Sequence, residues 1–387
     1  MRIDADVVSR MVHLRRDLHA HPELAYKEVR TAALVARELA ACGFAVHEGL
    51  GGTGVVGSLS RGAGPSVGLR ADMDALPIQE ATGLPHASRT PGVMHACGHD
   101  GHVAMLLGAA RHLAGRADLA GTVHVIFQPA EECAGGGRAM VDDGLFRLFP
   151  CETVWGLHNW PGLPLGTFAT RAGAIMASLD TFEIRVNGAG THAAMPERGI
   201  DTLVVASETV LALQTIVSRR LAPLDPAVVS VTQIHGGDAD NVIPDSAVIR
   251  GTVRCLSDGV RERVAGLVKG IAHGIAATHG AEAEVAYAFG YPATVNTADA
   301  VPRALDAAAR VPGITARHGD IPPSMASEDF AYMLRACPGA YAWLGTDGPT
   351  PGRPLHNPGY DFNDDALALG AGYWSALATD LLDAHRA

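Results

Sequence analysis

Short apolar runs that alternate with helical segments constrain the fold of this chain more than any other feature. The apolar runs are Val67–Leu69, Val123–Phe127, Val154–Leu157 and Tyr341–Leu344. Hydrophobic periodicity predicts helices over 7–18, 31–41 and 103–113. Strands that are apolar enough for burial on both faces, in alternation with helices, are typical of an α/β domain. We therefore expect a mixed, mostly parallel sheet flanked by helices.

A different pattern occupies the middle of the chain. Leu179–Val186 alternates apolar and polar residues, with the period of two of a half-exposed strand. A helix over 203–217, strands over 228–234 and 247–253, a helix over 257–279 and a strand over 282–287 are predicted to follow. This order is that of a ferredoxin-like α+β domain. We expect such a domain at 173–290, inserted into a larger domain formed by 1–172 and 291–387.

Composition and charge exclude several classes of partner. The 387 residues are 48% hydrophobic and 18% charged, with a net charge of −11 and no Lys/Arg run longer than two. A nucleic-acid or anionic-membrane surface is therefore not expected. The N-terminus has no signal-peptide pattern, and no apolar run reaches the roughly 20 residues of a membrane span. Six cysteines without paired spacing fit a reducing compartment, so we expect a cytoplasmic protein.

Acidic, thiol and imidazole side chains follow the predicted strands where each ends. They are Asp72 and Asp74 after the first strand, Glu131 and Glu132 after the second, His158 after the third, and Cys97 and His99 just before the helix at 103–113. Ligands bind outside the carboxyl ends of the strands in open α/β sheets. Imidazole, thiolate and carboxylate groups all bind zinc and transition-metal ions. The sequence therefore predicts a metal site at this edge of the sheet.

The neighbouring carboxylates Glu131 and Glu132 are informative as a pair. In a helix they would be ordinary surface charges, but here they follow a buried strand in a segment that contains Pro129. One carboxylate could bind metal while the other holds a proton from a metal-bound water, whose pKa falls to about 7. We expect this pair to supply a ligand and a general base.

Four ordered motifs resemble those of one enzyme family. The motifs are His95–His102, Gln128–Glu132, Gly156–Asn159 and Leu355–Pro358. They resemble the amidohydrolase branch of the aminoacylase/carboxypeptidase dinuclear metallopeptidase superfamily, which holds hippurate hydrolases, indoleacetyl-amino-acid hydrolases and N-acyl-amino-acid deacylases. The resemblance runs from Leu18 to His356 and includes the inserted segment. It implies a zinc-peptidase-like catalytic domain with an inserted lid and dimerisation domain.

The resemblance also implies roles for single residues in the catalytic domain. Two divalent ions (Zn, Mn, Ni or Co) would be held by Cys97, His99, Glu132, His158 and His356, with Cys97 as the bridge. Glu131 would be the base that activates the bridging water, and Asp74 would orient a ligand without binding metal. The wider superfamily has His-x-Asp where this chain has Asp72-Met73-Asp74. That difference favours the amidohydrolase branch over carboxypeptidases.

In the inserted segment, His192 resembles the lid histidine that polarises the scissile carbonyl, in many relatives across a dimer interface. Asn241 and Arg254 resemble the pair that contacts the terminal carboxylate of the substrate. Arg250 lies close to Arg254 in sequence and could serve in its place. His95 and His102 could orient metal ligands or simply cap and pack.

The function implied by the resemblance is metal-dependent hydrolysis of the amide bond of a small N-acyl amino acid, by a homodimer that pairs through the inserted domain. Three alternatives stay open. The first is a dipeptidase, carboxypeptidase or N-acetyl-diaminopimelate deacetylase of the same superfamily. The second is a hydrolase with Cys97 as nucleophile, and the third is a non-catalytic binding protein. The acyl group, the preferred amino acid and the native metal cannot be read from the sequence.

Overall fold

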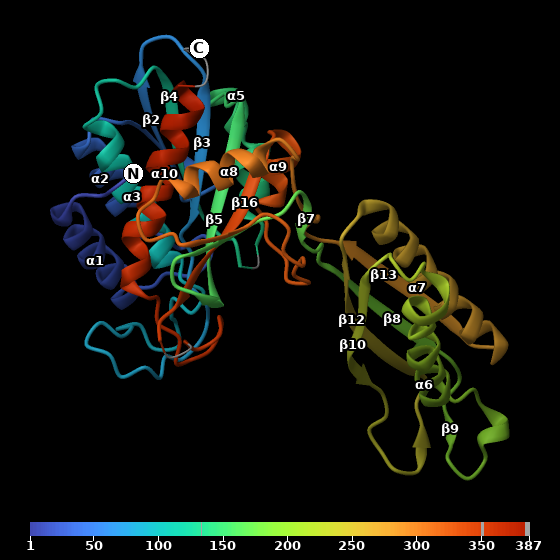
Figure 1. The fold of residues 1–387 in the computed structure, drawn as a ribbon. Coiled ribbons are helices and arrows are strands. Elements are labelled where there is room, and N and C mark those ends of the chain that lie inside the picture. Colours follow the sequence, from blue (N-terminus) through green and yellow to red (C-terminus); the bar gives the residue numbers. More distant parts are fainter. Residues whose placement is uncertain (133, 350–351, 384–387) are drawn as a thin grey trace. The chain divides into compact units, whose positions relative to one another are not determined.

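An eight-stranded mixed sheet forms the centre of the larger part of the molecule (Figure 1). Its strand order is β1-β2-β4-β3-β5-β16-β6-β15. The strands are β1 (Ala45–Leu50), β2 (Gly54–Arg61), β3 (Ser66–Asp72), β4 (Gly121–Gln128), β5 (Thr153–Pro164), β6 (Thr167–Ala169), β15 (Ala316–His318) and β16 (Gly339–Asp347). The central pairs β4–β3, β3–β5 and β5–β16 are parallel, whereas β1–β2, β2–β4 and β6–β16 are antiparallel. The mixed, mostly parallel sheet predicted from the apolar runs is confirmed.

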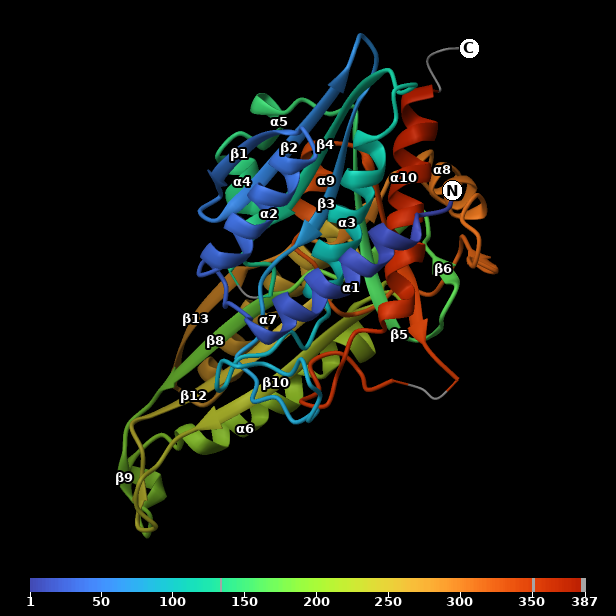
Figure 2. The same cartoon turned by 90° about the vertical axis from the view of Figure 1, so that its left-hand side faces the viewer.

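Helices cover both faces of this sheet. The helices of this part are α1 (Ala5–Ala20), α2 (Val29–Ala41), α3 (His99–Ala114), α4 (Gly136–Asp142), α5 (Leu145–Leu148), α8 (Ala300–Ala309), α9 (Ala331–Ala336) and α10 (Leu367–Asp383), with a 3₁₀ turn η3 (Asp364–Ala366). Figure 2 shows α1, α3 and α10 side by side on one face, with α4 and α9 behind the sheet. The side chains of α3 and α10 are buried on nearly every side because these helices lie between the sheet and other helices.

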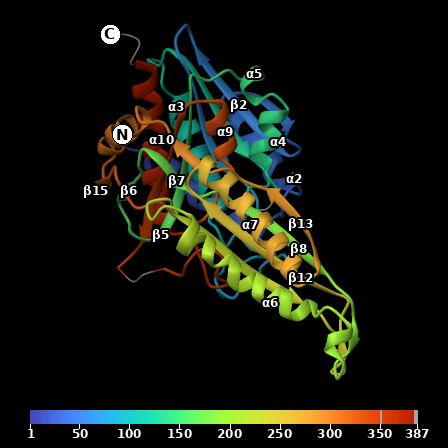
Figure 3. The ribbon, with the colours of Figure 1, turned by 90° about the vertical axis from the view of Figure 1, so that its right-hand side faces the viewer.

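A second, antiparallel sheet belongs to the middle of the chain (Figure 3). Its strand order is β10-β12-β8-β13, with strands β8 (Asp180–Asn187), β10 (Ala227–His235), β12 (Ser246–Cys255) and β13 (Glu282–Phe289). Helices α6 (Thr202–Leu213) and α7 (Asp258–Thr278) lie together along one face. Burial alternates along β8 as its sequence pattern predicts. The order β8-α6-β10-β12-α7-β13 is that of the expected ferredoxin-like fold.

Each sheet has a hydrophobic core of its own. The structure, a computed structural model, describes residues 1–132, 134–349 and 352–383, so Cys133 lies outside the described residues. Unit 1 comprises Met1–Ile175, Val295–Pro322 and the described residues from Asp329 onward, and unit 2 comprises Met176–Thr294 and Pro323–Glu328. The sequence offered no signal for the short segment Pro323–Glu328 of unit 2. The domain boundaries at 172 and 290 remain predictions.

The remaining elements are short. They are β7 (Gly173–Met176), β9 (Thr191–His192), β11 (Val242–Ile243), β14 (Thr294–Asn296), the 3₁₀ turn η1 (Pro196–Arg198) and the short π-helix η2 (Ile216–Arg220). Strand β9 pairs with β11, which sets His192 opposite Val242. Over the part of the chain that the structure describes, no helix has the length and apolar character that a bilayer crossing requires.

Candidate metal centre

Several segments of unit 1 meet beyond the carboxyl ends of the central strands. Asp72 ends β3, Glu131 and Glu132 follow β4, and His158 lies in β5. Cys97 and His99 stand at the N-terminal end of α3, and His356 comes from the loop that precedes η3. Parallel strands present their carboxyl ends at one edge, which is where α/β proteins bind ligands.

The five predicted ligand residues lie close together. The Sγ atom of Cys97 lies 3.5 Å from Nε2 of His158. Glu132 lies between two imidazoles, since its Oε1 is 3.9 Å from His99 Nε2 and its Oε2 is 3.4 Å from His356 Nε2. The ligand atoms of Cys97, Glu132 and His356 all lie within 4.8 Å of one another. The structure therefore gathers these side chains from four distant segments at one place.

Asp74 holds both the glutamate pair and one imidazole in place. Its two carboxylate oxygens accept the backbone N–H groups of Glu131 and Glu132, each at 3.0 Å. Its backbone carbonyl lies 2.9 Å from Nδ1 of His99, which leaves Nε2 of that ring toward Glu132. Ala130, just before the pair, has a φ of +55°, a costly conformation for a residue with a Cβ. This geometry fits a residue that orients ligands.

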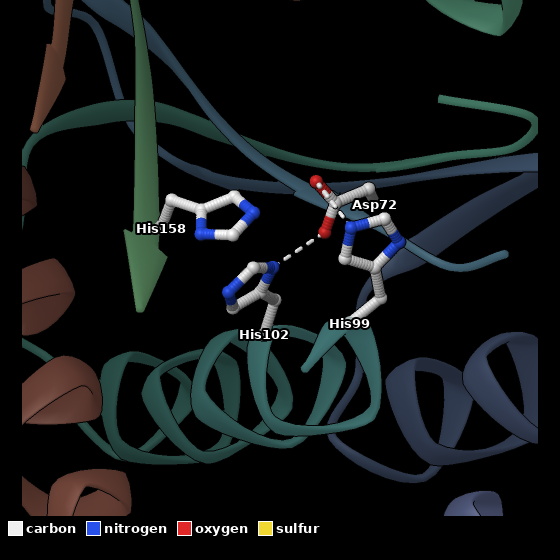
Figure 4. A group of neighbouring side chains, drawn as sticks. All are labelled: Asp72, His99, His102 and His158. Atoms are coloured by element: carbon white, nitrogen blue, oxygen red, sulfur yellow. Dashed lines mark hydrogen bonds and ion pairs between the residues drawn. The ribbon is translucent and has the colours of Figure 1, made fainter. Parts of the chain in front are cut away.

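Asp72 lies among three imidazoles (Figure 4). His102 Nδ1 lies 2.6 Å from Asp72 Oδ1, and Arg70 donates to Asp72 Oδ2 at 2.7 Å. His99 Nε2 is 3.7 Å from the same Oδ2. The His102 ring packs edge-on against the ring of His158, with 4.5 Å between centroids. Burial raises the pKa of Asp72, but His99, Arg70 and His102 outweigh it and hold the pKa well below the ordinary value.

Sequence reasoning left the role of His102 open and did not identify Arg70 or Asn159. The spacing of His99 and His102, three residues apart on α3, puts both on one helix face and was the available signal. His95 is also buried, and neither of its ring nitrogens has a hydrogen-bond partner among the described residues. Burial lowers the pKa of His95 to about 4, so its ring is neutral at physiological pH.

The electrostatics of the site favour a bound cation. Burial opposes a charge on His99, yet Asp72, Asp74 and Glu132 together raise the pKa of this imidazole to about 10. Burial, Glu132 and Glu131 raise the pKa of the Cys97 thiol well above its ordinary value. Negative groups thus outnumber positive ones here, and without a cation the site takes up protons.

Two unsatisfied atoms indicate where such a cation fits. His99 Nε2 and Glu132 Oε1 are buried, have no hydrogen-bond partner within 1–132, 134–349 and 352–383, and lie 3.9 Å apart. Buried polar atoms rarely stay unpaired. Nitrogen, oxygen and sulfur donors at this spacing match the chemistry of zinc and other first-row divalent ions. The residues present therefore fit a metal centre.

The predicted residues of unit 2 lie on its exposed surface or at its edge. His192 is exposed, and its Nδ1 accepts the backbone N–H of Ala194 at 3.0 Å. His192 and Asn241 both line a hollow of about 1260 Å³. Arg254 is half-buried on β12 and donates to Ser327 Oγ at 3.1 Å, and burial lowers its pKa. The alternative, Arg250, is exposed and pairs with Glu183 at 2.6 Å.

Comparison with known proteins assigns this arrangement to a family. The sequence profile of peptidase family M20/M25/M40 matches residues 68–380. The chain belongs to this family. The hippurate hydrolase of Campylobacter jejuni is 41% identical over 378 residues, which cover 97% of this chain and 98% of the relative. Thermostable carboxypeptidase 1 of Saccharolobus solfataricus is 40% identical over 370 residues, covering 93% of this chain and 92% of the relative.

A solved family M20 structure shows the same fold. The Bacillus subtilis protein YXEP, a dinuclear metal binding peptidase, superimposes with a TM-score of 0.86 at 37% identity, covering 98% of this chain and 99% of that one. With the family established, this M20 protein is an enzyme that hydrolyses amide bonds.

Proposed function

We propose that this family M20 enzyme hydrolyses small N-acyl amino acids at a centre of two divalent metal ions. The observation that carries the proposal is the glutamate pair. Asp74 anchors the backbone of both residues, Glu132 lies between two imidazoles, and Glu131 stands beside it. The 41% identity to a hippurate hydrolase, whose name denotes an N-acyl amino acid substrate, supports the same class of substrate.

In this proposal five side chains would hold the metal ions: Cys97, His99, Glu132, His158 and His356, with Cys97 as the ligand shared by both. Burial and His102 lower the pKa of His158, so this ring keeps a lone pair for an ion. When bound, the ions would polarise the amide carbonyl and lower the pKa of the attacking water. Zinc, manganese, nickel and cobalt all suit this donor set.

Glu131 transfers a proton from the attacking water to the leaving amine. This residue is 7% exposed, and its Oε1 accepts the backbone N–H of Asp329 at 3.3 Å, which restrains the carboxylate. Glu131 takes a proton from the water that attacks the amide carbon. It then gives that proton to the nitrogen of the leaving amine as the C–N bond breaks. The products are a free carboxylic acid and an amino acid.

For unit 2 we propose the roles of a lid and of a dimerisation domain. His192, exposed on β9, would polarise the scissile carbonyl. Asn241 and Arg254 would bind the terminal carboxylate of the substrate. Closure of the lid would be a step of turnover. Sedimentation of the purified protein tests the homodimer, and a monomer at assay concentrations would contradict it. We also propose a cytoplasmic location.

Substitution of the two glutamates tests the chemistry. Glu131→Gln keeps the shape of the side chain but cannot accept the proton, so kcat should fall by about a hundredfold to ten-thousandfold while the metal content stays near that of the wild type. Glu132→Gln is the matched control and should lose metal and activity together. Elemental analysis and release of amino acid from N-acyl amino acids are the measurements. Equal loss of metal and activity in Glu131→Gln would overturn its assignment as the base.

A peptidase of the same family is the second candidate, because a carboxypeptidase is 40% identical to this chain. A substrate panel of N-acyl amino acids, dipeptides and N-acetyl-diaminopimelate, compared by kcat/KM, distinguishes the candidates. A cysteine nucleophile is disfavoured because the raised pKa of Cys97 keeps the thiol protonated. Reversible inactivation by a chelator would exclude it.

A further inference from the structure

A continuous chain of buried hydrogen bonds runs beside the proposed metal centre. Its members are Tyr360, Asn159, His102, Asp72 and Arg70, none of which is more than 2% exposed. They come from the loop after His356, the middle of β5, the first turn of α3 and the end of β3. These segments also carry His356, His158 and His99. This chain of hydrogen bonds therefore includes a residue from each of the three segments that supply an imidazole.

The contacts are short and follow one another without a gap. Asn159 donates from Nδ2 to the hydroxyl of Tyr360 at 2.7 Å, and this hydrogen bond leaves its Oδ1 directed toward His102. That Oδ1 lies 2.6 Å from Nε2 of His102. The other ring nitrogen of His102 lies 2.6 Å from Asp72. Both ring nitrogens of His102 are therefore held by neighbouring side chains, and the rings of His102 and His158 pack in a T-shaped arrangement.

The hydrogen-bonded side chains also pack against the backbone between Cys97 and His99. Gly98 has a φ of +91°, which favours glycine. A Cβ at this position would come within 2.5 Å of Asn159 Oδ1 and 2.8 Å of the Tyr360 hydroxyl. The backbone that sets the thiol beside the imidazole is therefore packed directly against the hydrogen-bonded side chains.

At its Arg70 end, the chain of hydrogen bonds continues to Glu131, the proposed base. Arg70 donates to Asp72 at 2.7 Å and to Asp329 Oδ1 at 3.2 Å. The backbone N–H of Asp329 donates to Glu131 Oε1 at 3.3 Å. A single set of buried contacts therefore connects the loop of His356 with the carboxylate of Glu131.

His356 has few restraints of its own. Its side chain is 53% exposed and its φ is +63°. Its backbone N–H donates to the carbonyl of Ala96 at 2.8 Å. The next buried anchor along its loop is Tyr360, four residues later. The carbonyl of Pro358 also accepts the backbone N–H of Ala81 at 2.8 Å, and Tyr360 adds the first buried side chain that holds this loop after His356.

We infer that Tyr360, Asn159 and His102 are positioning residues that hold the imidazole-bearing segments in the geometry that binds metal. This inference rests on the ligand set of the proposed function. Groups that orient metal ligands typically change metal affinity or activity by about tenfold to a hundredfold when they are removed. The hydroxyl of Tyr360 should therefore control metal affinity although it is not a ligand.

Metal binding measured directly tests this inference. Metal-free wild type, Tyr360→Phe and His102→Gln are titrated with Co²⁺, whose absorption bands report the geometry of its ligands. Tyr373→Phe is the matched control, because Tyr373 is a buried tyrosine of α10 that packs on Phe168 and Trp374. The melting temperature of each metal-free protein reports any purely structural loss.

We expect Tyr360→Phe to bind Co²⁺ about tenfold more weakly than the wild type and to show shifted absorption bands. Its metal-free melting temperature should match that of Tyr373→Phe, which should bind Co²⁺ normally. Wild-type affinity and bands in Tyr360→Phe would overturn the inference. Failure of the wild type itself to bind Co²⁺ would instead overturn the metal centre of the proposed function.

The double variant shows whether the residues act as one chain. If Tyr360 and His102 act through Asn159, their combined effect on Co²⁺ affinity should be close to the larger single effect. If the two effects multiply, the residues act independently and the inference is wrong. Should His102→Gln fail to fold, the comparison of Tyr360→Phe with Tyr373→Phe decides alone.

Discussion

Loading of the metal-free enzyme should release about two protons. The pKa of about 10 for His99 means that fewer than about one His99 ring in a hundred is neutral near pH 7.5. The Cys97 thiol, with its pKa raised by burial and by Glu132, is protonated as well. His158 is already neutral because burial lowers its pKa, so it contributes no proton. Both His99 and Cys97 must lose a proton to bind an ion.

The sign and size of the pH dependence follow from this count. Each proton that metal displaces weakens binding tenfold for every pH unit below the pKa of its group. Overall affinity for the pair of ions should therefore rise by about a hundredfold per pH unit between about pH 6.5 and 8.5. The slope should decrease only as the pH approaches 10, where His99 becomes neutral by itself.

Titration calorimetry with Zn²⁺ in buffers of different ionisation enthalpy measures the protons directly. Cys97→Ala is the control and should release one proton fewer, in addition to any loss of affinity. Release of less than one proton by the wild type, or an affinity that does not change with pH, would refute the electrostatic description of the site.

Three further predictions concern stability. Burial disfavours a charge on His19, but Asp100 outweighs it and raises the pKa of His19 from 6.5 to about 9. His19 therefore contributes about 3 kcal/mol to the unfolding free energy below pH 6.5, and this contribution is lost as the pH rises to 9. The unfolding free energy of His19→Gln, measured in urea, should lack this decline, and the same dependence on pH as in the wild type would contradict the prediction. Gly98→Ala should cost at least about 1–3 kcal/mol, because its φ of +91° disfavours a Cβ and because that Cβ would come within 2.5 Å of Asn159 Oδ1. A melting temperature equal to that of the wild type would exclude strain at this position. Asp180 accepts two N–H groups of Arg261, so Asp180→Ala should destabilise unit 2 by about 3 kcal/mol. The rate of amide hydrogen exchange should rise in α7 but not in α3, and an equal rise in both helices would argue against a local effect.

The sequence predicted the elements of the fold where side-chain periodicity is strong. The alternation along β8 and the apolar runs of β3, β4 and β5 each correspond to a strand. Helix α10 is buried along nearly its whole length, and a helix that is apolar on every side has no amphipathic stripe to detect. The joining of Pro323–Glu328 to unit 2 depends on long-range contacts that no local pattern encodes.

The site could be predicted as far as strand ends and motifs allow. Strand ends indicated the edge at which Asp72, Glu132 and His158 meet, and the motifs added His356. The hydrogen bonds of Asn159 with Tyr360 and His102 could not be predicted, because they depend on how β5, α3 and a distant loop align in space. Such alignment is a property of packing and leaves no periodic signal in the sequence.

The position of β16 has a consequence for how the enzyme is made. This strand lies between β5 and β6 in the sheet, although it follows them in the chain by more than 160 residues. While the ribosome is still translating the middle of the chain, the facing edges of β5 and β6 have no partner, and an unpaired edge invites pairing with other chains. The intervening ferredoxin-like segment can complete its own sheet during that interval. The sheet of unit 1 is completed only after the last part of the polypeptide has been synthesised. The speed of translation therefore sets how long the edges of β5 and β6 stay unpaired.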